Sequence, residues 1–162
     1  MSSEVVISGI GSAFSGSGNV QDFGRDLLNN KHLVQRTKRW REDLFTPVSG
    51  TVPSEHFDGQ FFGINSKLAN STDPTSILCY MRSYEAVLDA GLHPSTLRGS
   101  NTGVFACSGI NEYEQKIMHS DAIEQHEGYI IMGLSRTMLP NRLSYYFNWN
   151  GKRSQERCKI LI

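Results

Sequence analysis

The segment from residue 73 to residue 94 carries a full set of signals that begin and end a helix. Asp73 is placed to cap the helix N-terminus, and Pro74 follows as its first residue. Gly91 suits the left-handed conformation that ends many helices, and Pro94 blocks any continuation. The sequence therefore predicts a helix over residues 74–90.

Apolar residues recur along one face of this predicted helix. They are spaced at four, three and four residues, and they are Ile77, Met81, Tyr84 and Leu88. This spacing places them on one side of a helix. We expect the stripe to pack into the protein core rather than to line a cofactor site.

The remaining patterns predict strands that alternate with helices. EVVISGI at residues 4–10 and TGVFACSG at residues 102–109 predict buried strands, and Asn19 would cap a helix over residues 20–31. Residues 32–62 predict a long surface loop with one short strand near residues 49–53. A helical pattern over residues 129–146 contains Pro140, which is expected to kink or end that helix. This order predicts an α/β fold with a mainly parallel sheet and flanking helices.

Composition limits the possible partners. The 162 residues suit one domain, and sixteen basic and sixteen acidic residues give a net charge of zero. No apolar run approaches the roughly 20 residues of a membrane helix, and the N-terminus lacks a signal-peptide pattern, so we expect a cytoplasmic protein without a membrane partner. The three cysteines are widely spaced, which predicts reduced thiols rather than a disulfide framework or a zinc site.

A glycine-rich loop after the first predicted strand leaves nucleotide binding as a less favoured alternative. Helix N-termini and exposed amides can hold phosphate, but the register is Gly9-x-Gly11-x-x-Phe14, where the dinucleotide fingerprint requires a third glycine. A basic stretch around Trp40 could contact nucleic acid. The acidic residues that follow it and the zero net charge favour a solvated loop, so we expect no nucleic acid partner.

No group of side chains predicts a metal site or a nucleophile. His119 and His126 lie near acidic residues, but at no recognised ligand spacing. Ser135 in GLSRT resembles a nucleophile elbow only to its third letter, because Thr137 stands where glycine is required. Cys158 lies between two cations, which favour a thiolate, but no histidine is near it in sequence, so we expect an inert thiol.

Four segments follow one another in an informative order: EVVISGIGSAF, FDGQFFGINSKLANSTDP, the helix and strand that end in YEAVLDAGLHPSTLRGSNTGVF, and NRLSYYFN. Together they resemble the N-terminal portion of a β-ketoacyl synthase domain, and most closely that of an animal-type fatty acid synthase. The resemblance spans about residues 4–151. It implies a thiolase-like fold, in which two similar α/β halves sandwich central helices, and of which this chain is an incomplete N-terminal half.

The resemblance also implies a reaction. In the family, an acyl group is joined to malonyl carried on acyl carrier protein, so acyl and malonyl thioesters and that carrier are the implied partners, and no cofactor is implied. A cysteine thiolate accepts the acyl chain, and two histidines assist decarboxylation and polarise the carbonyl. All three residues come later than the region that matches this chain.

The chain departs from the family after Gly151. The family continues with Pro-Ser and a strand that leads into Asp-Thr-Ala-Cys-Ser-Ser-Ser, whereas here residues 152–162 form a divergent charged tail. Cys158 is followed by Lys159 and Ile160 rather than serines, so it is not carried over as the nucleophile. We expect residues 1–151 to be a partial β-ketoacyl synthase region with no catalytic residue of its own, inactive alone as an acyltransferase.

One substrate-pocket residue is carried over by the resemblance. Ile110 in CSGIN matches a position that lines the acyl pocket in related synthases, and the alternative is an ordinary apolar loop residue. The alternative function is a non-catalytic interaction fragment that pairs its exposed sheet edge or apolar faces with an intact synthase, or forms a homodimer.

Overall fold

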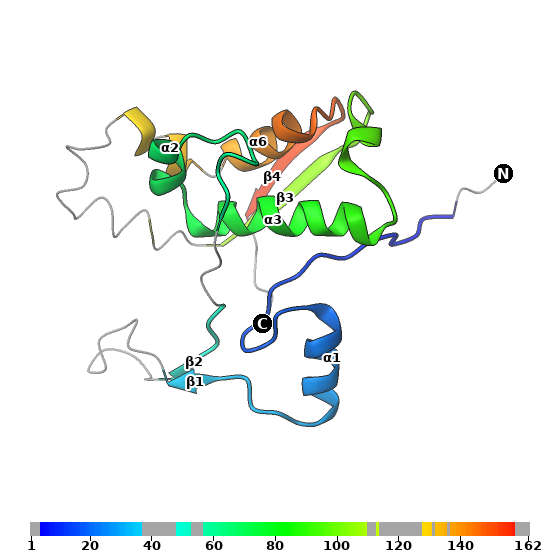
Figure 1. Ribbon diagram of the computed structural model, residues 1–162, viewed down its shortest axis with the longest axis vertical. Helices are drawn as coiled ribbons and strands as arrows, with labels where there is room; N and C mark the ends of the chain where they lie inside the picture. Colours follow the sequence, from blue (N-terminus) through cyan, green and yellow to red (C-terminus); the bar gives the residue numbers. More distant parts are fainter. Residues whose placement is uncertain are drawn as a thin grey trace. The chain divides into compact units, whose positions relative to one another are not determined.

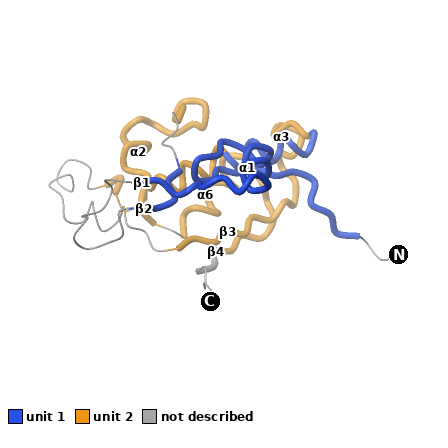
Figure 2. The backbone as a smooth tube through the Cα atoms, turned by 90° about the horizontal axis from the view of Figure 1, so that it is seen from below, with its two compact units in different colours: residues 1–56, 82–91 blue, residues 57–81, 92–162 orange. Residues whose placement is uncertain are grey.

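The computed structural model describes residues 4–36, 48–52, 57–109, 113, 128–130, 132–135 and 137–157. The chain divides into two units, which Figure 2 colours blue and orange. Unit 1 comprises residues 1–56 and 82–91, and unit 2 comprises residues 57–81 and 92–162. Each unit is described by itself.

Helix α3 (Pro74–Asp89) confirms the helix predicted from its start and stop signals. The Asp73 carboxylate accepts a hydrogen bond of 3.1 Å from the backbone N–H of Thr75, and Gly91 adopts a φ of 72° in the left-handed region. The Asp73 cap and the turn at Gly91 satisfy backbone polar groups at the helix ends that have no partner within the helix. The short 3₁₀ helix η1 (Pro94–Leu97) follows.

The predicted core stripe of α3 is only partly correct. Leu88 is 46% exposed, whereas the most buried residues of the helix are Ser76 and Tyr80. The ring of Tyr80 lies 5.5 Å from that of Phe62 and 6.0 Å from that of Tyr146, measured between centroids. Packing among these aromatic rings decides which face of α3 is buried, and apolar spacing alone could not show it.

Unit 2 contains the parallel strand pair. Strand β3 (Val104–Ser108) pairs along its whole length with strand β4 (Arg153–Arg157), with Val104 opposite Arg153. Helix α6 (Met138–Phe147) contacts both strands, and the three elements lie together in Figure 1. Strand β3 confirms the position of the second predicted strand but not its burial, because Val104 is buried whereas Phe105 is 69% exposed. Strand β4 was not predicted, because its sequence RSQER lacks the apolar residues of a buried strand.

The prediction that Pro140 kinks or ends a helix is wrong. Helix α6 begins at Met138, so Pro140 is its third residue and is buried. The first N–H groups of a helix have no partner within it, and proline in the first turn therefore removes no helical hydrogen bond. The helix ends at Asn148, which adopts a left-handed φ of 54°.

The prediction of a buried strand at residues 4–10 is also wrong. This segment has no strand assignment, and Val5, Val6 and Ile7 are 94%, 71% and 85% exposed. Its glycines instead lie against the C-terminal half of α3. A Cβ on Gly9 would be 2.1 Å from the carbonyl oxygen of Ala86. The backbone at Gly9 packs closely on helix α3 and does not pair with a neighbouring strand.

The rest of unit 1 is held by polar contacts. Helix α1 (Val20–Leu28) is capped by Asn19, as predicted. The buried carboxylate of Asp26 accepts hydrogen bonds from Lys31 at 2.8 Å and from Ser17 at 2.9 Å. The bond from Lys31, followed by that from Ser17, lowers the pKa of Asp26. Strands β1 (Gln35–Arg36) and β2 (Val48–Ser49) form an antiparallel pair, which places a short strand close to the predicted position.

Of the two cysteines that the structure describes, Cys79 is a free thiol, as predicted, and Cys107 is not. Cys107 in β3 is disulfide-bonded and exposed. Cys79 in α3 is free, and burial, with a smaller contribution from Asp73, raises its pKa. The argument from spacing failed because disulfide formation depends on distance in space, which sequence intervals do not report.

Two further observations complete the fold. Helix α2 (Ser66–Ser71), which the sequence did not predict, is capped by the Asn65 side chain through a 2.8 Å hydrogen bond from the N–H of Leu68. Within the described ranges, no helix is long and apolar enough to cross a membrane.

Candidate functional site

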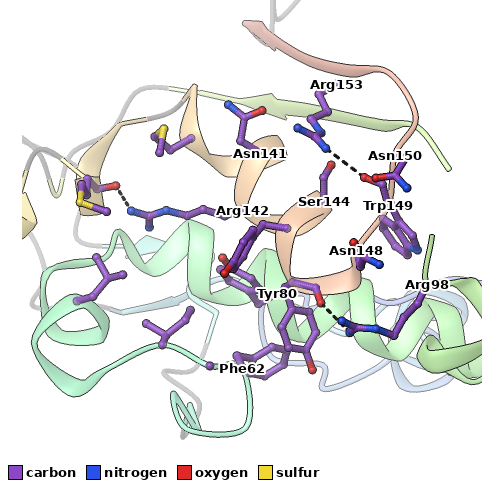
Figure 3. A pocket seen from close by; sticks show the side chains of 17 residues that line it. Phe62, Tyr80, Arg98, Asn141, Arg142, Ser144, Asn148, Trp149, Asn150 and Arg153 are labelled. Atoms are coloured by element: carbon purple, nitrogen blue, oxygen red, sulfur yellow. Dashed lines mark hydrogen bonds between the residues drawn. The ribbon is translucent and has the colours of Figure 1, made fainter. Parts of the chain in front are cut away.

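Unit 2 contains a pocket of about 870 Å³, shown in Figure 3. This volume lies within the range of about 300–1,000 Å³ typical of small-molecule sites. The pocket is formed by the segment before and within α2, by α3, by the residue after η1, by α6 and the turn that follows it, and by the start of β4. The lining residues used below are Phe62, Tyr80, Arg98, Arg142, Ser144, Tyr146, Trp149 and Arg153.

Aromatic rings form the apolar wall of this pocket. The centroid of Phe62 lies 4.9 Å from that of Tyr146 and 5.5 Å from that of Tyr80. Trp149, which also lines the pocket, stacks on Phe147 at 4.3 Å with an interplanar angle of 9°. Such pairs add stability beyond burial of their area. The wall is therefore a packed surface that presents π faces and ring edges to an occupant.

The charged lining residues all carry the same sign. Arg98, Arg142 and Arg153 line the pocket, and no aspartate or glutamate in the described part of the chain does. Each guanidinium donates to a backbone carbonyl: Arg98 to Tyr146 at 3.5 Å, Arg153 to Trp149 at 3.2 Å, and Arg142 to Met132. A guanidinium has five N–H donors, so most of their donor capacity remains for an anion.

Burial controls the protonation of two residues in the pocket. It raises the pKa of Tyr80 to about 12, and the Arg142 charge opposes this increase. Burial also lowers the pKa of Arg142, which the Tyr80 phenolate would oppose. Near neutral pH, Tyr80 is therefore an uncharged phenol and Arg142 remains a cation.

Two buried polar atoms in the wall have no hydrogen-bond partner. They are the hydroxyl of Ser144, a residue that is 1% exposed, and the indole N–H of Trp149, a residue that is 7% exposed. Buried polar groups in proteins are nearly always paired. The indole N–H only donates, so its missing partner is an acceptor.

Most of the predicted site residues lie outside the described residues. These are Trp40, Ile110, His119, His126 and Cys158. The acyl-pocket prediction for Ile110 therefore stays a prediction. Ser135 is described, and its hydroxyl forms a 2.9 Å hydrogen bond with that of Thr137. Among the residues that the structure describes, no three His, Cys, Asp or Glu side chains gather as metal ligands.

The glycine-rich loop has a structural explanation. A Cβ on Gly11 would be 2.0 Å from the carbonyl oxygen of Arg82, so glycine is needed where this loop touches α3. A small pocket of about 220 Å³ beside it, within unit 1, is lined by the carboxylates Glu85 and Asp89. Negative charge there disfavours phosphate, which weakens the nucleotide-binding alternative.

Comparison with known protein families and sequences shows where the chain belongs. The family described as β-ketoacyl synthase, N-terminal domain, matches residues 2–154. The chain is 37% identical over 152 residues to a fatty acid synthase of Anser anser anser, covering 91% of this chain and 43% of that sequence. It is 32% identical over 163 residues to a highly reducing polyketide synthase of Phaeosphaeria nodorum, covering 91% of this chain and 6% of that sequence.

Solved structures show the same fold. The ketosynthase from module 6 of the bacillaene synthase of Bacillus subtilis aligns with a TM-score of 0.74 at 24% identity, covering 93% of this chain and 25% of that one. An oxazolomycin ketosynthase domain of Streptomyces albus aligns with a TM-score of 0.78 at 21% identity, covering 96% of this chain and 29% of that one. The predicted thiolase-like α/β class is confirmed. The chain spans less than half the length of each of these relatives.

Proposed function

Because this chain belongs to the β-ketoacyl synthase family through its N-terminal domain, we propose that it forms the N-terminal part of a ketosynthase of fatty acid synthesis. The complete enzyme would join acyl and malonyl thioesters, the latter on acyl carrier protein, by decarboxylative condensation. The observation that carries the proposal is the family match over residues 2–154, and 37% identity to a goose fatty acid synthase supports the fatty acid branch.

The proposal includes an inactive isolated chain. The resemblance places the nucleophilic cysteine and both histidines after the matching region, and residues 152–162 replace the family sequence with charged residues. Without the thiolate, no acyl-enzyme forms, and without the histidines, decarboxylation lacks its catalysts. Acyl transfer would then require residues that this chain does not supply. The cytoplasmic location and the role of Ile110 in the acyl pocket remain part of the proposal.

A hybrid enzyme tests the proposal. Residues 1–151 replace the matching segment of an avian fatty acid synthase, and acyl loading is measured with a radiolabelled acyl-CoA. We expect the hybrid to form an acyl-enzyme and the isolated 162-residue chain to form none. A hybrid whose nucleophilic cysteine is replaced by alanine provides the blank.

Two results would contradict the proposal. A hybrid with native-like circular dichroism that fails to load would show that these residues do not serve as a ketosynthase N-terminal part. A stable thioester on the isolated chain would show that it carries its own nucleophile.

Exposed apolar residues support a second candidate, a non-catalytic fragment that associates with an intact synthase or with itself. Val5 and Ile7 are 94% and 85% exposed, as are Phe105 of β3 at 69% and Tyr145 of α6 at 88%. Exposed apolar surface favours association. On size-exclusion chromatography we expect this chain to elute earlier when mixed with an intact fatty acid synthase. A monomer whose elution is unchanged by the synthase would count against this candidate.

A further inference from the structure

We infer that the pocket of unit 2 binds a small amphipathic carboxylate, with its apolar body on the aromatic wall and its carboxylate among Arg98, Arg142 and Arg153. The inference stands on the residues of the pocket and does not rest on the proposed function. The pocket volume of about 870 Å³ suits a ligand of ordinary small-molecule size.

The charge of the pocket selects an anion. Three arginines line it, and among the described residues no carboxylate side chain does. The side chain of Arg142 is partly buried, and in Figure 3 the labelled arginines come from three separate parts of unit 2. Arginine recognises carboxylates through paired hydrogen bonds, and these bonds are strong because both partners are charged. An uncharged ligand of the same shape would leave this donor capacity unused.

The other lining groups select the rest of the ligand. Phe62, Tyr80 and Tyr146 provide an aromatic surface for an apolar body. Trp149 and Ser144 also line the pocket; the indole N–H and the hydroxyl are buried and unpaired, and either could donate to a carboxylate oxygen once its side chain turns toward the ligand. An apolar body with an acceptor-bearing, negatively charged end satisfies each of these features.

A matched pair of probes tests the inference. 2-Naphthoate has the apolar body and the carboxylate, and 2-naphthamide has the same rings without the charge. We expect 2-naphthoate to bind saturably and to shift the indole N–H signal of Trp149 in a ¹⁵N-correlated NMR spectrum. The chain has two tryptophans, so a Trp149→Phe variant assigns that signal. We expect 2-naphthamide to bind at least about tenfold more weakly.

Variants locate the binding to the arginines. In Arg98→Gln combined with Arg153→Gln we expect the affinity for 2-naphthoate to fall by about tenfold or more. Arg25→Gln, an exposed residue of α1 paired with Asp22, is the control with the same chemical change and should bind normally. Circular dichroism checks that each variant is folded.

Several outcomes would overturn the inference. They are equal affinity for the two probes, no shift of the Trp149 signal, an equal loss in the Arg25 variant, or no binding of 2-naphthoate. Binding of an acidic aromatic peptide at this pocket, with no binding of 2-naphthoate, would also overturn it, since the occupant would then be a protein segment.

Discussion

Replacement of Phe147 by alanine is expected to lower the free energy of unfolding by about 3–5 kcal/mol. Phe147 is the last residue of α6, is 1% exposed, and stacks on Trp149 at 4.3 Å. The substitution removes a fully buried ring and leaves a cavity beside the pocket wall. Urea denaturation followed by tryptophan fluorescence measures the change, because Trp149 is in contact with the altered site.

Phe105→Ala is the matched control. Phe105 lies in β3, which α6 contacts, but its side chain is 69% exposed. Surface substitutions usually change stability by no more than about 0.5 kcal/mol. Similar losses for the two variants would show that α6 does not bury Phe147 as the structure places it.

Gly151→Ala is expected to destabilise unit 2 by about 1–3 kcal/mol. A Cβ at this position would lie 2.5 Å from the carbonyl oxygens of both Asn101 and Thr102. Those contacts are with backbone, which cannot rotate away as a side chain can. The strand pair begins beside it, where the N–H of Val104 donates to Lys152 at 2.8 Å. Urea denaturation should show a lower midpoint.

Gly24→Ala is the control for the loss of a glycine. Gly24 lies inside α1, and a Cβ there would meet no atom within 4 Å. Alanine is a better helix former than glycine by about 1 kcal/mol, so we expect this variant to be more stable, in the opposite direction to Gly151→Ala. If both variants lost stability, the close approach at Gly151 would not be the cause.

The capping signals at the ends of α1 and α3 were read correctly from the sequence. Asp73, Pro74 and Gly91 predicted the ends of α3, and Asn19 predicted the start of α1. A cap or a left-handed glycine acts through its own backbone neighbours, so adjacent residues contain the needed information. The family resemblance, carried by longer segments, was confirmed by the match to residues 2–154.

Features that depend on distant neighbours were missed. The β-branched residues 4–10 have the composition of a strand, yet they form none and contact α3 at Gly9 and Ile10, because strand formation needs a partner and composition does not supply one. The pocket was missed for a similar reason. Arg98 and Arg153 are 55 positions apart, and only the fold brings them to one cavity. The nearest available signal was the density of aromatic residues in SYYFNW beside Arg142.

Strand β4 shows that a parallel strand can form without the apolar residues that usually mark one. Its ladder to β3 is made by main-chain amides and carbonyls, which every residue other than proline provides. Polar and charged residues can therefore form a strand without loss of the pairing.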